Sequence, residues 1–168
     1  MPEIILLRHG KSDWDAPHDH DRDRPLSRRG VGSAQTMGRV LTSIGRKPDL
    51  VIASPAARAQ ATAELASEAG GWEAPLDTVD ALYGGGPESV LAAVHGVPRD
   101  VGRVLLVGHE PTWSATASLL IGGGDHRVAT GTAVGLETAL PWPRIGPATC
   151  RMVWLLPPRL FTDGRPAV

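Results

Sequence analysis

Three short runs of consecutive apolar residues are the clearest feature of the chain. Residues 4–7 read Ile-Ile-Leu-Leu, residues 50–53 read Leu-Val-Ile-Ala, and residues 104–107 read Val-Leu-Leu-Val. Strands that are buried on both faces of a parallel sheet have this unbroken apolar pattern, whereas strands with one exposed face alternate apolar and polar residues. The three runs therefore predict three buried strands of a parallel sheet.

Segments with helical spacing lie between and after these runs. Apolar residues recur at i, i+3, i+7 and i+10 in residues 34–44, and at i, i+4, i+7 and i+8 in residues 113–121. Pro55, Pro87 and Pro111 stand where a first helical turn would begin, a position that tolerates proline because its missing N–H would have no partner there. We predict four helices, three of which start at a proline.

Two later segments, residues 133–138 and 150–156, are predicted to be strands joined by the loop at 141–147. The alternation of strands and helices along the chain is typical of a sheet that is covered on both faces. We predict an α/β fold: a three-layer α/β/α sandwich with a mostly parallel central sheet and an antiparallel edge strand. The chain, at 168 residues, has the size of one domain, which we place at 1–158, with an irregular tail at 159–168.

The balance of charged residues excludes some functions. With 17 basic and 18 acidic residues, the chain lacks the broad positive field that binds nucleic acids or anionic membranes. Its single cysteine, Cys150, argues against a disulfide framework and for a reducing compartment. The early apolar run at 4–7 is too short for a signal peptide or a membrane span. We expect a soluble, cytoplasmic protein without a nucleic-acid or membrane partner, and a monomer is favoured.

Residues with useful chemistry follow each of the three apolar runs. Arg8 and His9 follow the first, Arg58 lies one turn into the helix after the second, and His109 follows the third. Ligands of open α/β sheets bind outside the carboxyl ends of the strands, so we expect these side chains to converge there. Guanidinium groups and helix N-termini bind phosphoryl oxygens. The placement predicts a phosphate site that needs no metal.

The two histidines would add covalent chemistry to this site. A neutral imidazole nitrogen can attack phosphorus, and a second imidazole can stabilise the charge on the equatorial oxygens. Taken alone, a histidine after a buried strand is more often structural, and Arg58 would be an ordinary surface residue of a helix. The joint placement after three strands favours phosphoryl transfer through His9.

Four sequence blocks in a fixed order carry the most specific signal. They are LLRHGKSDW at 6–14, DRPLSRRG at 23–30, SPAARA at 54–59 and VGHEP at 107–111. Together they resemble the histidine phosphatase superfamily, which has the phosphoglycerate-mutase-like fold, and within it the small SixA-like group of phosphohistidine phosphatases.

The resemblance implies a role for each matching residue. His9 would be the phosphorylated nucleophile, Arg8 and Arg58 would bind the phosphoryl group, and His109 would be the second catalytic histidine and a phosphate ligand. Arg24 matches an arginine that reaches the same pocket in the small group. From the sequence, an ion pair between Arg24 and the neighbouring Asp21 or Asp23 explains it equally well.

The residue that would protonate the leaving group has no clear candidate. Mutases and broad phosphatases of the superfamily place an acidic residue in the middle segment, where Glu88 is the one carboxylate of residues 82–89. Its place in the first turn of a predicted helix makes compensation of the helix dipole the better explanation. We leave the acid unassigned.

The segment His18-Asp19-His20-Asp21 contains metal-ligand residue types at close spacing. Adjacent ligands on a loop rarely converge without a further distant pair, so a solvated loop at the rim of the pocket is favoured.

These observations predict a metal-independent phosphatase without a cofactor, which forms a phosphohistidine on His9, hydrolyses it with water and releases inorganic phosphate. A phosphorylated protein, and phosphohistidine in particular, is the favoured substrate. Two alternatives stay open: a phosphatase of small phosphomonoesters, and a non-catalytic module that binds phosphorylated partners.

Overall fold

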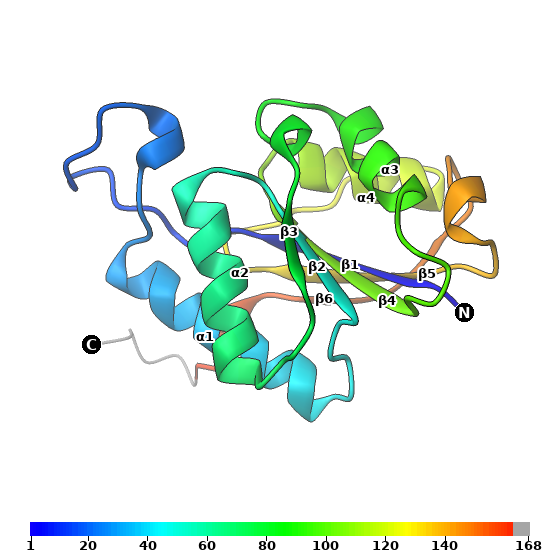
Figure 1. The fold of residues 1–168 in the computed structure, drawn as a ribbon, viewed down its shortest axis with the longest axis horizontal. Coiled ribbons are helices and arrows are strands. Elements are labelled where there is room, and N and C mark those ends of the chain that lie inside the picture. Colours follow the sequence, from blue (N-terminus) through cyan, green and yellow to red (C-terminus); the bar gives the residue numbers. More distant parts are fainter. Residues whose placement is uncertain (163–168) are drawn as a thin grey trace.

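The computed structural model describes residues 1–162, which form a single sheet with helices on both faces (Figure 1). The strands are β1 (Glu3–Arg8), β2 (Leu50–Ala53), β3 (Leu76–Thr78), β4 (Arg103–Gly108), β5 (Ala133–Glu137) and β6 (Arg151–Leu156). The helices are α1 (Arg28–Ser43), α2 (Ala57–Gly70), α3 (Pro87–His95) and α4 (Thr112–Ile121). Four short 3-10 helices lie at Asp21–Asp23, Asp80–Leu82, Trp142–Arg144 and Pro158–Leu160.

The strands are ordered β3-β2-β4-β1-β5-β6 across the sheet. β1, β2, β3 and β4 run parallel to one another, whereas β5 is antiparallel to both of its neighbours, β1 and β6. This confirms the predicted mostly parallel sheet. The reversed strand, predicted at the edge, is β5, which lies one position inside the edge strand β6. The sequence pattern did not predict β3, because this edge strand has three partly or fully exposed residues and no apolar run.

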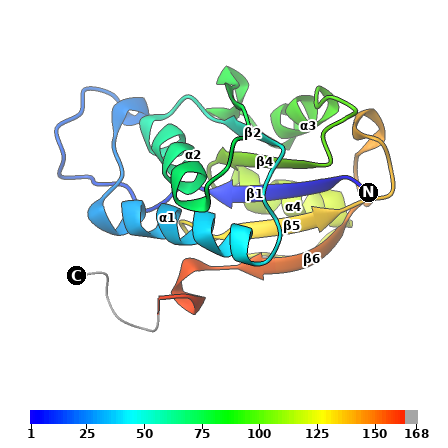
Figure 2. The same ribbon diagram turned by 60° about the horizontal axis from the view of Figure 1, so that its bottom comes forward.

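The central strands are buried on both faces, which explains their unbroken apolar runs. Ile4 and Leu6 of β1 pack toward α3 and α4, in one core with Val94 of α3. Ile5 and Leu7 pack toward α1 and α2, in a second core with Leu41 of α1. Figure 2 shows the two helical layers on opposite sides of the sheet. The predicted α/β/α sandwich is therefore confirmed.

The starts of the helices differ from the prediction in two of three cases. Pro87 is the first residue of α3, as predicted. Pro111 is the N-cap residue of α4, and Pro55 lies two residues before the first residue of α2. Proline fixes φ at a value that also suits these flanking positions. A proline therefore indicates that a helix begins nearby, but it does not identify the first helical residue.

The predicted irregular tail begins with the 3-10 helix at Pro158–Leu160, and residues 163–168 lie outside the described part of the chain. No helix within residues 1–162 is both long and apolar enough to cross a bilayer.

α1 and α2 lie in direct backbone contact at Gly38. A Cβ atom placed on Gly38 would lie 2.1 Å from the carbonyl oxygen of Ala66 in α2. Near the same ends of the helices, the indole of Trp72 donates a hydrogen bond to Thr42 Oγ1 (2.8 Å). This contact matters for the site because α2 carries Arg58 and α1 follows the loop that carries Arg24.

We expect Gly38→Ala to lower the free energy of unfolding by about 1–3 kcal/mol, because the added methyl group would push the two helices apart. Gly32→Ala is the matched control in the same helix, since a Cβ atom there would meet nothing within 4 Å. The control should be neutral or stabilising by up to about 1 kcal/mol through helix propensity. Urea denaturation followed by circular dichroism measures both; equal effects of the two variants would refute the close contact.

Candidate active site

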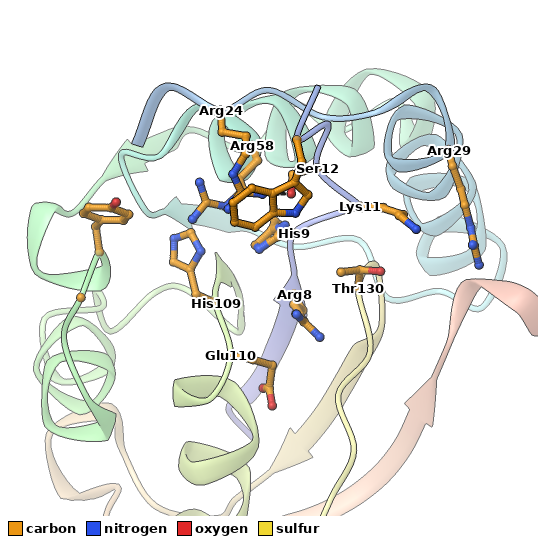
Figure 3. Close-up of a pocket in the computed structure, with 13 residues that line it drawn as sticks. Arg8, His9, Lys11, Ser12, Arg24, Arg29, Arg58, His109, Glu110 and Thr130 are labelled. Atoms are coloured by element: carbon orange, nitrogen blue, oxygen red, sulfur yellow. Dashed lines mark hydrogen bonds between the residues drawn. The ribbon is translucent and has the colours of Figure 1, made fainter. Parts of the chain in front are cut away.

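A pocket of about 720 Å³ lies at the carboxyl ends of β1, β2 and β4 (Figure 3). All five residues singled out in the sequence line it: Arg8, His9, Arg24, Arg58 and His109. The other lining residues are Lys11, Ser12, Trp14, Arg29, Tyr83, Gly84, Glu110 and Thr130. The convergence expected from the three strand ends is therefore present in the fold.

The His9 ring is held in one tautomer. The side chain is buried, and its Nδ1 lies 2.6 Å from the carbonyl oxygen of Gly10. Since a carbonyl can only accept a hydrogen bond, Nδ1 carries the proton and Nε2 of the neutral ring keeps its lone pair. Burial lowers the pKa of His9 to about 3, and the nearby charges of Arg58 and Arg8 act in the same direction. At neutral pH, His9 is a neutral base with a free Nε2.

The loop after His9 is fixed from two sides. A Cβ atom on Gly10 would lie 2.5 Å from the carbonyl oxygen of Gly30, so the loop packs directly on the first turn of α1. On the other side, Gly10 N donates to Thr62 Oγ1 (3.0 Å), which itself donates to the Arg58 carbonyl (2.7 Å). Thr62 thus ties the His9 loop to the turn of α2 that carries Arg58. The sequence pattern does not indicate this role for Thr62.

His109 stands beside His9, with 5.2 Å between the ring centroids. Its Nε2 lies 2.7 Å from Ser54 Oγ, just after β2, and the Tyr83 and His109 rings pack in a T-shaped arrangement. Burial lowers the pKa of His109 to about 4, and the positive charge of Arg58 contributes. His109 is therefore also neutral at neutral pH. Ser54 belongs to a sequence block noted above, but its contact with His109 was not predicted.

Arg8 and Arg58 are both placed with unused donors. Arg58 is buried, and Arg8 is half-buried with its Nη1 donating to the Val128 carbonyl (3.0 Å). The Nε atoms of both side chains are buried and have no hydrogen-bond partner within residues 1–162. Buried donors without partners carry a free-energy cost. The guanidinium groups that carry them line the pocket, where charged N–H groups can bind an oxyanion.

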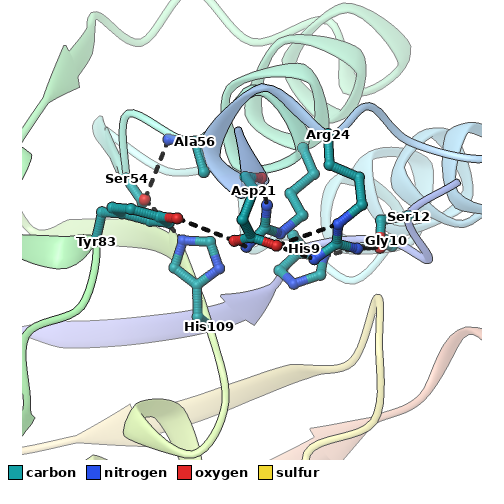
Figure 4. A network of polar contacts seen from close by, with 10 residues as sticks. His9, Gly10, Ser12, Asp21, Arg24, Ser54, Ala56, Tyr83 and His109 are labelled. Carbon is teal, nitrogen blue, oxygen red and sulfur yellow. Dashed lines mark hydrogen bonds and ion pairs between the residues drawn. The ribbon is translucent and has the colours of Figure 1, made fainter. Parts of the chain in front are cut away.

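Arg24 satisfies both explanations given for it from the sequence. It lines the pocket, and its Nη2 donates to Asp21 Oδ1 (2.8 Å) (Figure 4). Its Nη1 donates to Ser12 Oγ, and the Trp14 ring covers the guanidinium at 3.6 Å. A salt bridge to Asp21, a hydrogen bond to the Ser12 hydroxyl and a cation–π contact with Trp14 therefore stabilise the buried Arg24 side chain.

Asp21 does more than pair with Arg24. Its Oδ2 accepts hydrogen bonds from Arg58 Nη2 (3.0 Å) and from the Tyr83 hydroxyl (2.9 Å), and its backbone carbonyl accepts from Arg58 Nη1 (2.7 Å). The hydrogen bonds from Arg24, Tyr83 and Arg58 hold the pKa of Asp21 well below its usual range. The sequence analysis considered Asp21 as an ion-pair partner of Arg24 and as part of the segment His18–Asp21. Nothing in the chain order points to its bridge to Arg58.

Two carboxylates deserve comparison as proton donors. Glu88 does not line the pocket; its Oε1 accepts from Gly86 N (3.0 Å) at the start of α3, in agreement with a role at the helix terminus. Glu110 does line the pocket, although it was not singled out in the sequence. Both of its oxygens accept hydrogen bonds from Ser114, from the backbone N (2.8 Å) and from Oγ (2.7 Å). The geometry therefore points to neither as the acid.

The His18–Asp21 segment provides no metal centre in the described part of the chain. No group of three His, Cys, Asp or Glu side chains within residues 1–162 is placed to hold a metal ion. Instead, His18 Nδ1 donates to the Ala16 carbonyl (2.7 Å), and Asp21 turns its carboxylate to the arginines.

Fold and site together define an α/β protein with a cationic, two-histidine pocket at the carboxyl edge of its sheet. The profile of the histidine phosphatase superfamily (branch 1) matches residues 4–83. An uncharacterised protein of Mycobacterium tuberculosis is 37% identical over 165 residues, which cover 91% of this chain and all of that protein. The chain belongs to the histidine phosphatase superfamily.

Solved structures support the same assignment. A candidate phosphohistidine phosphatase SixA from Nakamurella multipartitia is 30% identical, with a TM-score of 0.81 over 92% of this chain and 95% of that one. The protein histidine phosphatase SixA in complex with tungstate has the same TM-score of 0.81, over 93% of this chain and 97% of that one. Its identity of 21% supports the fold alone.

The two neutral histidines predict a specific dependence of stability on pH. Because the native pKa of His9 is about 3 and that of an unfolded histidine is about 6.5, the unfolded chain binds a proton that the native chain does not. The free energy of unfolding should therefore fall as the pH drops below about 6.5. Between pH 7.5 and 5, His9 should account for about 1–2 kcal/mol of this loss.

Urea denaturation of the wild type and of His9→Asn at both pH values, in phosphate-free buffer, measures the difference. The asparagine variant should lose less stability on acidification than the wild type. An equal loss in the two proteins would mean that His9 is not held neutral.

Proposed function

We propose that the protein is a phosphatase that forms a covalent phosphohistidine at His9 Nε2 and that its substrate is phosphohistidine in a protein. The observation that carries the proposal is the His9 ring, neutral and with a free Nε2, in a pocket that four arginines also line. A pocket that only bound phosphate would have no need for a neutral, attacking imidazole.

In the first step, the Nε2 lone pair attacks phosphorus and the bond to the leaving group breaks, so that the leaving atom keeps the electron pair. Arg8 and Arg58, which line the pocket, bind the phosphoryl oxygens through their planar guanidinium groups. The Gly10 carbonyl stabilises the Nδ1 proton as the ring gains positive character.

In the second step, a water oxygen attacks phosphorus on the phosphoenzyme, the Nε2–P bond breaks, and its electron pair returns to Nε2. Inorganic phosphate leaves and the neutral ring is restored. His109, beside His9, supplies a polar contact for charge on the equatorial oxygens without adding a fixed positive charge.

The leaving group supports phosphohistidine as the substrate. An alkoxide is a strong base and leaves slowly unless an acid protonates it, whereas a protonated phosphohistidine ring leaves as neutral imidazole. Asp21 is ionised, and both Glu110 oxygens already accept hydrogen bonds from Ser114. A substrate that needs no acid therefore suits this pocket better than an alkyl phosphate.

We expect His9→Ala to reduce turnover by at least about a thousandfold, because removal of the nucleophile disables both steps. His126→Ala, which changes a histidine that does not line the pocket, should leave turnover unchanged. Rapid quench with a ³²P-labelled substrate should trap an acid-labile, base-stable phosphoenzyme in the wild type. All assays are run in EDTA, since no step requires a metal ion.

Full turnover by His9→Ala would refute the assignment of His9 as the nucleophile. A wild type that binds phosphate but never releases product would favour the non-catalytic binding module, and recovery of activity only after addition of a divalent cation would refute the metal-free mechanism.

A second prediction concerns the leaving group. Phosphohistidine and activated aryl phosphates should be hydrolysed at least about a hundredfold faster than sugar or glycerol phosphates, because no acid assists the leaving oxygen. Single-turnover phosphorylation rates across substituted phenyl phosphates should fall steeply as the pKa of the phenol rises. Glu110→Gln should show the same steep dependence as the wild type. A flat dependence in the wild type that becomes steep in Glu110→Gln would identify Glu110 as the acid and favour the small-molecule phosphatase.

A further inference from the structure

Two of the arginines that line the pocket are already paired with a carboxylate of the protein. The Asp21 carboxylate pairs with two guanidinium groups. Its Oδ1 accepts from Arg24 (Figure 4), and its Oδ2 accepts from Arg58. Asp21 sits on the 3-10 helix Asp21–Asp23, and the Asp21 carbonyl is bound by the same Arg58 side chain. Arg58 therefore holds this residue by its main chain and its side chain together.

The two guanidinium groups need such a partner. The side chains of Arg24 and Arg58 are only 7% and 6% exposed, and burial of a charge without a counter-charge is costly. Within residues 1–162, no carboxylate other than Asp21 forms a salt bridge with either of them. Glu110 lies on the far side of the pocket, where it interacts electrostatically with Arg8.

The bridge leaves both arginines able to bind a second anion. Asp21 uses one hydrogen on each terminal nitrogen of Arg58, so the Nε–H and a further hydrogen on each terminal nitrogen remain. Arg24 gives Nε and Nη2 to Asp21 and Nη1 to Ser12, and each terminal nitrogen keeps one hydrogen. A phosphoryl group can therefore bind while Asp21 stays in place.

We propose that Asp21 is a positioning residue with two effects: its carboxylate fixes the orientation of Arg24 and Arg58, and it offsets part of their positive charge so that the phosphate product is held less tightly. The proposal rests on the proposed function, because it takes these arginines as phosphate ligands. Tyr83 completes the arrangement, since its hydroxyl donates to the same carboxylate and its ring packs against the His109 ring in a T-shaped contact.

Loss of the Asp21 carboxylate should therefore strengthen oxyanion binding but slow turnover. Without the negative charge of Asp21, the pocket attracts an oxyanion more strongly. Without two equivalent acceptor oxygens, however, the guanidinium groups lose their fixed orientation, and misplaced phosphate ligands slow the chemical step. A residue that merely stabilised the fold would not produce this opposition.

The experiment compares Asp21→Asn, Asp21→Glu and the wild type, with Asp23→Asn as the matched control. Asp23 carries the same charge on the same 3-10 helix and is exposed like Asp21, but it makes no salt bridge within the described residues. Isothermal titration calorimetry with tungstate measures oxyanion binding, and an aryl phosphate assay gives kcat and KM. Thermal unfolding of each variant verifies that it is folded.

We expect Asp21→Asn to bind tungstate about three- to tenfold more tightly than the wild type, with kcat reduced at least about tenfold. Asp21→Glu retains the charge, so its tungstate Kd should stay within about twofold of the wild type while kcat is partly recovered. Asp23→Asn should change neither quantity, because the Asp23 side chain forms no salt bridge with either arginine, and a solvated charge without such a contact is screened.

Unchanged or weaker tungstate binding by Asp21→Asn would refute the claim that Asp21 offsets the positive charge of the arginines. An unchanged kcat would refute the claim that Asp21 positions them. The binding comparison does not depend on turnover. A wild type that binds tungstate but hydrolyses no phosphorylated substrate would refute the proposed function alone, while tighter binding by Asp21→Asn would still support the charge effect. A wild type that does not bind tungstate would refute both.

Discussion

The chemistry of the pocket depends on the short hydrogen bond from His9 Nδ1 to the carbonyl of Gly10. This bond places the ring proton on the side away from the free Nε2, and burial keeps the ring from taking a second proton. Both conditions require a rigid loop, which the close approach of Gly10 to Gly30 and the hydrogen bond to Thr62 provide. The state of one imidazole is thus set by contacts with both helices of one layer.

The sheet order explains why the loop has so little freedom. β1 lies between β4 and β5, so the backbone of Arg8 and His9 is held from both sides. His9 N donates to the Gly108 carbonyl at the end of β4 (3.0 Å). On the other side, Gly131 N, just before β5, lies 3.1 Å from the Arg8 carbonyl and 3.0 Å from the His9 carbonyl. The reversed strand β5 therefore contributes to the site without placing a side chain among the predicted catalytic residues.

How much of this could be predicted depends on whether a residue's role is local. The strands β1, β2 and β4 are buried on both faces, so their apolar runs could be recognised in the sequence. The runs also indicated which residues follow the strand ends. The short edge strand β3 is partly exposed and left no such pattern.

The missed contacts are those that join distant parts of the chain. Asp21 and Tyr83 are 62 residues apart, and Ser54 and His109 are 55 residues apart. No periodicity or spacing predicts such a pair, because each residue type is common in loops and the contact exists only once the sheet order is set. Arg8, His9, Arg58 and His109 were found because strand ends and sequence blocks both identify them, and Arg24 was found from a sequence block alone. Asp21 and Tyr83 follow none of the three apolar runs, and Ser54, which follows the second, carries no sign of its contact with His109.

The distribution of charge in the pocket has a consequence for catalysis. The chain as a whole carries a net charge of −1, yet Arg8, Arg24 and Arg58 converge on one site. An enzyme gains rate only from interactions that are stronger in the transition state than with substrate or product, and fixed positive charge attracts all three. Neutral histidines avoid adding to this unselective attraction, and a carboxylate between two arginines reduces it while keeping their donors in place. The electrostatic contribution can then come mainly from hydrogen bonds directed at the positions of the phosphoryl oxygens, which are sensitive to geometry in a way that net charge is not.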